Sequence, residues 1–311
     1  MREERADTIR MDELWASLDG QSDDEKASTY LGIVEVLMEH ERYASALPLI
    51  DIAIELERSH HGDKKHPHVG EAIIAKAFCS WHISETDRAV ELLEEGLTFQ
   101  SMLPSSMKVD RFQTLAAWYS HLGRRDDMLR VKKDLVELYE DSEETIDLGL
   151  HLQSLALAYF QLGQFADAHA CALRSHHYLN TIEQTLLAAR SEILLGACQA
   201  EIGEIEEGLE RTTKAIEIVR HEEGEDNRDP RALYFQGLTL LRAGQFEGAR
   251  DFLLEARSFI ALNPEKHEIE IKISIEKELA ATYALLDETQ NSGEINERLQ
   301  LVKNYFIDIF S

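Results

Sequence analysis

Hydrophobic positions along this chain recur at helical spacing in blocks that resemble one another. The stretches 150–173, 190–216 and 233–256 each begin with an apolar pattern of helix length and continue with a Gly turn. A bulky residue follows two positions later, a small residue three positions after that, and then a second apolar pattern. Such repetition is typical of helical arrays, in which each unit buries its apolar face on its neighbours. The pattern therefore predicts an all-α protein built of helix–turn–helix pairs.

The same positions match those of a known repeat family. The paired helices of tetratricopeptide repeats have a small residue at position 8, an aromatic residue at 11, a turn glycine at 15, a bulky residue at 17 and small residues at 20 and 27. Only small side chains let two crossing helices bring their backbones together, and the bulky ones fill the remaining space. The chain resembles this family. The clearest matches are Ala156, Tyr159, Gly163, Phe165, Ala168 and Ser175 in one block, Leu195, Gly196, Gly203, Ile205, Gly208 and Ala215 in the next, and Gly237, Gly244, Phe246, Ala249 and Ala256 in the third.

The repeats are longer than usual. When weaker copies on either side are included, the turn positions fall at 41, 84, 123, 163, 203, 244 and 287, so that successive steps are 43, 39, 40, 40, 41 and 43 residues. Typical tetratricopeptide repeats have about 34 residues. The resemblance therefore narrows to the elongated repeats of kinesin light chains and of the sensor halves of bacterial regulators. It implies a right-handed α-solenoid of about seven repeats.

The two ends of the array have their own signals. We expect residues 1–22 to form an N-terminal capping helix and turn, because an amphipathic stretch that contains Leu14 and Trp15 precedes a polar break. No Pro-rich or Ser-rich linker interrupts residues 23–311, which are predicted to form one continuous repeat domain. The polar run 286–298 predicts an irregular last hairpin.

One short stretch is rich in histidine, with His60, His61, His66 and His68 within nine residues. In the elongated branch, a Gly-x-x-His-Pro-x-Val-like loop often joins one repeat to the next, and residues 62–69 resemble it. The Asp229-Pro230 segment repeats the arrangement, and a proline suits the first turn of the following helix. The resemblance thus explains the histidines without a metal. Zinc bound by His66 and His68 stays an alternative, although no cysteine or paired carboxylate lies at a customary ligand spacing nearby.

The resemblance also implies a binding surface. In tetratricopeptide arrays the first helix of each repeat lines the concave side, with positions 2, 5, 6, 9, 12 and 13 pointing inward. Aromatic rings supply apolar contact area to a peptide or partner helix, and polar groups fix its register. Core packing is the alternative for each aromatic residue, because a one-position alignment error rotates a residue by about 100° around its helix. The predicted peptide- or partner-binding residues are Phe78, Trp81, His82, Gln113, His121, Gln153, Phe160, Gln161, Tyr234, Phe235 and Arg242.

Composition and motifs exclude several functions. The formal net charge of −27 repels phosphate backbones, so no nucleic acid partner is expected. No apolar run is long enough for a membrane span, and the N-terminal stretch lacks the apolar segment of a signal peptide. The three cysteines, Cys79, Cys171 and Cys198, lie in apolar patterns and are expected to be buried thiols of a cytoplasmic protein. The common nucleotide-binding, zinc-peptidase and serine-hydrolase signatures are absent, so neither a catalytic residue nor a cofactor is predicted.

Three functional hypotheses follow. The first is a non-enzymatic adaptor or scaffold that holds a peptide or partner-protein segment in the concave groove. The second is a bacterial intracellular peptide sensor or regulator resembling the peptide-pheromone receptors. For this second hypothesis, we find neither room for the N-terminal helix-turn-helix of the DNA-binding receptors nor a counterpart of the helical bundle that carries the catalytic glutamine of the phosphatase receptors. The third is a metal-dependent protein that uses the His60–His68 loop. A homodimer stays open, because repeat arrays can pair through either face.

Overall fold

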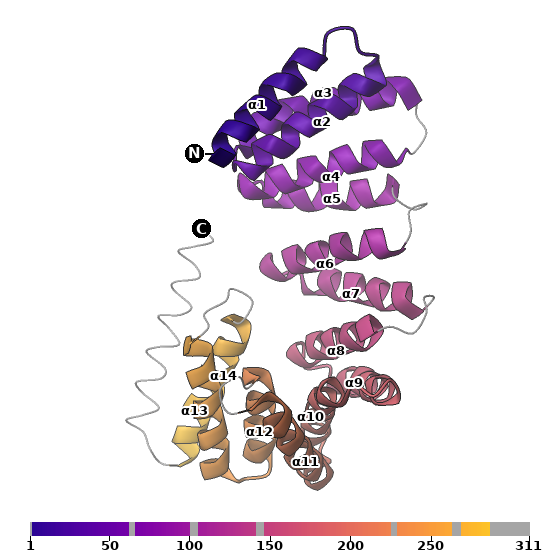
Figure 1. The fold of residues 1–311 in the computed structure, drawn as a ribbon. Helices are drawn as coiled ribbons and strands as arrows, with labels where there is room; N and C mark the ends of the chain where they lie inside the picture. Colours follow the sequence, from indigo (N-terminus) through magenta and orange to yellow (C-terminus); the bar gives the residue numbers. More distant parts are fainter. Residues whose placement is uncertain are drawn as a thin grey trace. The chain divides into compact units, whose positions relative to one another are not determined.

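The chain folds into helices joined by short turns. The computed structural model describes residues 2–61, 66–99, 105–140, 146–224, 229–262 and 269–286, which form fourteen α-helices and no strand (Figure 1). The helices are α1 (Arg2–Ser17), α2 (Asp23–Glu39), α3 (Tyr43–His61), α4 (Pro67–His82), α5 (Thr86–Phe99), α6 (Ser105–His121), α7 (Arg125–Glu140), α8 (Ile146–Gln161), α9 (Phe165–Thr181), α10 (Thr185–Glu201), α11 (Ile205–Glu223), α12 (Pro230–Arg242), α13 (Phe246–Leu262) and α14 (Ile269–Leu285).

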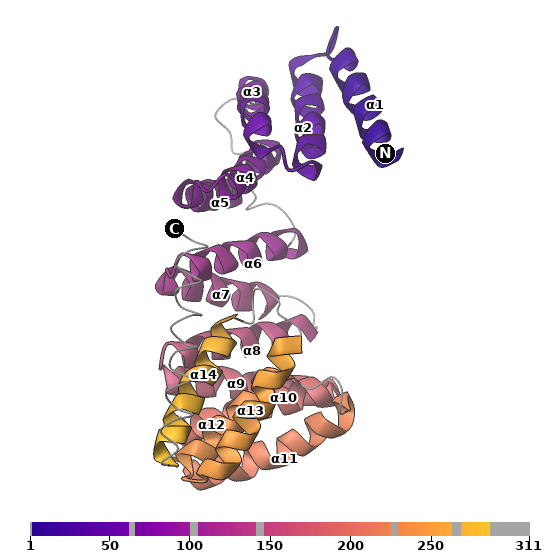
Figure 2. The ribbon, with the colours of Figure 1, turned by 90° about the vertical axis from the view of Figure 1, so that its left-hand side faces the viewer.

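The described helices group into two compact units, of which the first ends at Leu138 and the second begins at Tyr139. Consecutive helices pack as pairs: α2 on α3 and α4 on α5 in the first unit, and α8 on α9, α10 on α11 and α12 on α13 in the second. Figure 2 shows α4 beside α5 and α13 beside α14. The all-α repeat fold predicted from the sequence is therefore confirmed. The single domain expected over residues 23–311 stays a prediction, and most of the irregular last hairpin expected at 286–298 lies outside the described residues.

The tight turns share one hydrogen-bonding pattern. In each, one residue takes a positive φ, and the next residue's N–H donates to a carbonyl five positions back, as from Gln164 to Tyr159 and from Gln184 to Leu179, both at 2.9 Å. This Schellman arrangement satisfies the last carbonyl groups of the helix and reverses the chain within a few residues. The six described turn positions predicted from the sequence are confirmed, the position at 287 lies outside the described residues, and Glu183 is an additional turn. The positive-φ residues of the turns with this bond are Glu41, Ser84, Gly123, Gly163, Glu183, Gly203 and Gly244, and Gly20 and Gly224 take a positive φ elsewhere.

Because Glu183 has a φ of 59°, its side chain strains the turn between α9 and α10. Replacing Glu183 by Gly is expected to raise the free energy of unfolding by about 0.5–1 kcal/mol, because glycine has no Cβ to crowd the backbone. The check is urea denaturation followed by circular dichroism. At the equivalent glycine turn, Gly163→Ala is expected to lower the same free energy by about 1 kcal/mol. Equal effects of the two changes would contradict this explanation of the turn.

Small residues are essential where α10 crosses α11. A Cβ added at Gly208 would lie 2.5 Å from the carbonyl oxygen of Gly196, and one added at Gly196 would lie 2.7 Å from the carbonyl oxygen of Gly208. The two backbones are therefore in direct contact at the positions that the repeat pattern reserves for small side chains. The crossing explains why two glycines occur here despite their low helix propensity.

Helix α1 packs on α2, and its predicted role as the N-terminal cap stays a prediction. The ring of Trp15 lies edge-on to that of Tyr30, with a centroid distance of 6.2 Å. Arg10 forms an ion pair with Glu35 at 3.3 Å. The side chain of Trp15 nevertheless remains partly exposed, so α1 covers the end of the first unit incompletely.

The thiols of Cys79 and Cys198 are buried, and that of Cys171 is half-buried. Burial raises the pKa of Cys79 to about 11 and the pKa of Cys198 to about 12, so both thiols are neutral at pH 7. The expectation of buried, unpaired thiols is thus confirmed for these two residues. Among the described residues, no helix combines the length and the apolar character needed to cross a membrane.

Candidate functional site

The first helices of successive pairs form a row in the second unit. Helix α8 contacts α10, α10 contacts α12, and α12 contacts α14. The described second helices α9, α11 and α13 make no comparably extensive contacts with one another. The first helices therefore lie closer together and line the inner side of this unit. Side chains on this row, which we call the inner row, are the candidates for binding.

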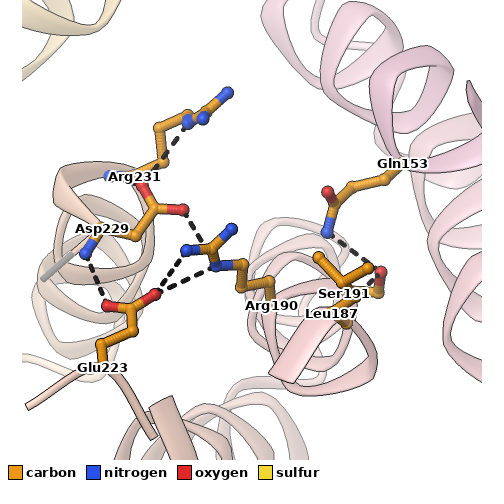
Figure 3. Close-up of polar contacts among 7 residues, drawn as sticks. All are labelled: Gln153, Leu187, Arg190, Ser191, Glu223, Asp229 and Arg231. Atoms are coloured by element: carbon orange, nitrogen blue, oxygen red, sulfur yellow. Dashed lines mark hydrogen bonds and ion pairs between the residues drawn. The ribbon is translucent and has the colours of Figure 1, made fainter. Parts of the chain in front are cut away.

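A polar group is fixed on the inner row where α8 faces α10. The Nε2 of Gln153 donates to Oγ of Ser191 at 3.0 Å, and Figure 3 shows the amide oxygen of Gln153 turned away from this bond. Buried Ser191 lies 2.9 Å from Oγ of buried Ser175, which donates to the carbonyl oxygen of Gly149 at 2.7 Å. The half-buried Gln153 is thus anchored by a buried network. A fixed amide oxygen of this kind can accept a hydrogen bond from a peptide N–H group.

Arg190, the neighbour of Ser191, is held between two carboxylates (Figure 3). Its guanidinium donates to Oε1 of Glu223 from Nε at 3.1 Å and from Nη2 at 2.5 Å, and Nε lies 3.3 Å from Oδ2 of Asp229. The second oxygen of Glu223 accepts from the backbone N–H of Asp229 at 2.8 Å, and Asp229 caps α12 by accepting from the N–H of Arg231 at 2.9 Å. The Glu223 and Asp229 side chains are 3% and 8% exposed. We call Arg190, Glu223, Asp229 and Arg231 the Arg190 clamp. The clamp joins α10, the end of α11 and the start of α12.

Two further predicted polar residues reach solvent in the second unit. Arg242 donates from Nε to Oε1 of Glu201 at 2.8 Å, while its side chain remains 40% exposed. Gln161 is exposed at the C-terminal end of α8. Together with Gln153, they place three of the predicted binding residues where a ligand can reach them.

The predicted aromatic residues of the second unit are buried instead. The ring of Phe160 lies edge-on to that of Phe235, with a centroid distance of 5.1 Å, and Tyr234 contacts Phe235 at the same distance. Their exposed fractions are 9%, 5% and 7% for Phe160, Phe235 and Tyr234. Burial raises the pKa of the Tyr234 hydroxyl above its usual value. These rings therefore belong to the packed core next to the inner row. They offer a ligand little contact area, because they pack edge to face on one another.

In the first unit, aromatic side chains of α4 and α6 form a cluster. Trp81 stacks on Trp118 with a centroid distance of 4.5 Å, Phe78 lies edge-on to Trp118 at 5.4 Å, and His121 lies edge-on to Trp81 at 5.3 Å. Trp118 is buried, Phe78 and Trp81 are half-buried, and His121 is exposed. The structure thus brings the predicted residues Phe78, Trp81 and His121 together with Trp118, which was not predicted from the sequence. The half-buried rings leave apolar area available to a partner.

The two remaining predicted residues of the first unit are exposed. His82 stacks on Tyr43 of α3 with a centroid distance of 4.1 Å, and Gln113 lies on α6. The binding role of the whole predicted set stays a prediction.

Arg190 was not among the residues predicted from the sequence, although it stands at inward position 2 of its repeat, counted from Gly196 at position 8. Its partner Glu223 is 33 residues further along the chain, so the spacing of residues within one helix does not indicate that the two side chains meet.

The histidine-rich stretch contains a convergence that the sequence did not reveal. Residues 62–65 lie outside the described part, but His66 and His68 at the start of α4 meet Glu57 of α3, and the ligand atoms of all three lie within 4.8 Å of one another. Pro67 begins α4, as Pro230 begins α12, so the predicted role of both prolines is confirmed. Glu57 is nine positions before His66 and gives no customary ligand spacing. The one sequence feature that could have drawn attention to Glu57 is the presence of an acidic residue among the apolar residues on one face of α3.

Comparison with known proteins extends the fold assignment. No protein-family model and no curated protein matches the sequence. The structure is similar to that of RapI in its apo form, at 13% identity over 91% of this chain and 98% of that one, with a TM-score of 0.62. It is also similar to a Rap protein complexed with competence and sporulation factor, at 13% identity over 96% and 80% of the two chains and a TM-score of 0.56. Aspartyl phosphate phosphatase F from Bacillus subtilis matches at 13% identity over 94% and 88%, with a TM-score of 0.54. The fold is a helical repeat fold of the tetratricopeptide type.

Proposed function

We propose that this chain is a non-enzymatic adaptor that binds an extended peptide segment along the inner row of its second unit. The observation that carries the proposal is the anchoring of the half-buried Gln153, whose amide is fixed by Ser191 while its oxygen points away from that bond. Arg242 is held in a similar way by Glu201 and remains partly exposed. Polar groups that are already held in place before binding, as Gln153 and Arg242 are, lower the entropy cost of binding a flexible segment.

Similarity of fold adds support by analogy. A Rap protein that shares this fold has been solved with competence and sporulation factor bound, although at 13% identity the likeness extends only to the fold. The cytoplasmic location expected from the sequence accompanies the proposal as a prediction, and a homodimer stays open. The narrower alternative is a peptide sensor, which would bind a short free peptide and then alter a partner protein.

The test is selection of peptides from a displayed random library on the purified full chain, followed by fluorescence polarisation with a labelled selected peptide. The double change Gln153→Ala and Gln161→Ala is expected to weaken binding at least tenfold, because both amides would contact the peptide backbone. His177→Ala, an exposed change on the second helix α9, is the control and should leave affinity unchanged.

Selection of no peptide, or binding that the control weakens as much as the double change, would contradict the proposal. Binding of a selected sequence as a short free peptide would favour the sensor. Binding only within a folded carrier protein would favour the adaptor.

A further inference from the structure

We propose that Glu57, His66 and His68 form a zinc-binding site in the first unit, between α3 and the start of α4. Nδ1 of His68 lies 3.7 Å from Oε1 of Glu57, and the two imidazole rings meet edge-on with a centroid distance of 4.9 Å. In a tetrahedral zinc site with bonds of about 2.0–2.2 Å, neighbouring ligand atoms are about 3.3 Å apart. All three ligand atoms already lie within 4.8 Å of one another, so side-chain rotations alone can close the site.

The position of Glu57 is the first independent argument. Ile50, Ala53 and Ile54 precede it on the buried face of α3, and Glu57 continues this stripe at 1% exposure. The equivalent position, four residues after repeat position 27, is a buried apolar residue in α9, α11 and α13 and a half-buried tyrosine in α7. A carboxylate buried among such neighbours requires a cationic partner or a metal. The equivalent residues are Tyr139, Leu179, Val219 and Ile260.

The role of His66 is the second argument. His66 occupies the N-cap of α4, just before Pro67, in the same way that Asp229 occupies the N-cap of α12 before Pro230. Asp229 caps its helix by accepting from the N–H of Arg231, whereas the side chain of His66 makes no capping hydrogen bond. A poor capping residue therefore stands at the cap, with its imidazole beside Glu57. The proline between His66 and His68 fixes its own φ and so restricts the backbone that joins the two histidines.

Two imidazoles and one carboxylate are a ligand set that suits zinc, with a fourth position left for water. The His68 side chain is 60% exposed, so an ion has a path from solvent. Zinc bound here would join the last turn of α3 to the first turn of α4 and would stabilise the first unit. The inference is independent of the proposed peptide binding, which concerns the second unit.

The experiment is isothermal titration of the untagged full chain with Zn²⁺ after treatment with a chelator, with Co²⁺ as a spectroscopic probe. We expect one equivalent of zinc, a rise in Tm that EDTA reverses, and the intense visible absorption of tetrahedral Co²⁺. Glu57→Gln, His66→Ala and His68→Ala should each weaken zinc binding by about 100-fold or more, since each removes a direct ligand. His177→Ala on α9 is the control for an exposed histidine and should bind zinc as the wild type does.

Glu57→Leu separates a built site from general affinity of a histidine-rich stretch. It introduces the kind of apolar residue that the other repeats carry, so the metal-free variant should fold with an unchanged or higher Tm. It should nevertheless lose the zinc-induced rise in Tm and most of the affinity. Zinc binding by Glu57→Leu as tight as that of the wild type would overturn the proposal, as would a wild type that takes up no zinc at micromolar concentrations.

Discussion

Gly208→Ala is expected to lower the free energy of unfolding by about 2–3 kcal/mol. The added Cβ would lie 2.5 Å from the carbonyl oxygen of Gly196 and 3.0 Å from the backbone nitrogen of Ala200. Both contacts are with backbone atoms of α10, which cannot rotate away as a side chain can, so α10 and α11 must separate. Alanine gains at most about 1 kcal/mol of helix propensity over glycine, which is too little to compensate. Urea denaturation followed by circular dichroism measures the change.

Gly248→Ala is the matched control for this prediction. Gly248 lies in the first turn of α13, as Gly208 lies in the first turn of α11, but its added Cβ would meet Leu240 at an ordinary 3.6 Å. The control should leave stability unchanged or raise it by up to about 1 kcal/mol. If both variants lose the same stability, close contact at the α10–α11 crossing is not what requires glycine.

Glu223→Ala is expected to lower the free energy of unfolding by about 2–3 kcal/mol, because it removes a member of the Arg190 clamp. Glu223 is 3% exposed and accepts hydrogen bonds from the Arg190 guanidinium and from the backbone N–H of Asp229. Its removal leaves that N–H group without this acceptor and Arg190 with Asp229 as its remaining carboxylate partner in the clamp. The start of α12 would then be held less firmly against α10. Thermal and urea denaturation of the full chain measure the loss.

The neighbouring Glu222 provides the control for the clamp. Its side chain is 47% exposed, and its contact with His221 is an exposed pair at 3.4 Å. Glu222→Ala should change the free energy of unfolding by no more than about 0.5 kcal/mol. Similar losses in the two variants would show that the clamp contributes little. The clamp also lies beside the inner row, so Glu223→Ala tests whether peptide affinity depends on the position of Arg190.

Local chemistry explains why the turns were predictable. The chain reverses where one residue takes a positive φ, and Gly163, Gly203 and Gly244 mark such positions because glycine adopts this conformation without strain. The spacing of apolar residues also determines which face of each helix is buried. Glu41 and Ser84 carry no such glycine and were placed by the repeat spacing, whereas Glu183 was missed because it lies between two repeats, outside the turn position that the pattern counts.

The candidate sites depended on longer-range geometry. The rings of Phe160, Tyr234 and Phe235 stood at inward positions of the repeat pattern, yet they pack on one another and are buried. Periodicity places a side chain on a face of its own helix, but it does not state how closely the next helix approaches that face.

The sequence by itself therefore determined the helical repeats, the six described turns expected from it, and the need for small residues where paired helices cross. The meeting of Glu57 with His66 and His68, and that of Arg190 with Glu223, emerged only once the helices had packed. The physical reason is range: turns and helix faces depend on neighbours a few residues away, whereas these polar groups are brought together by contacts between separate helices.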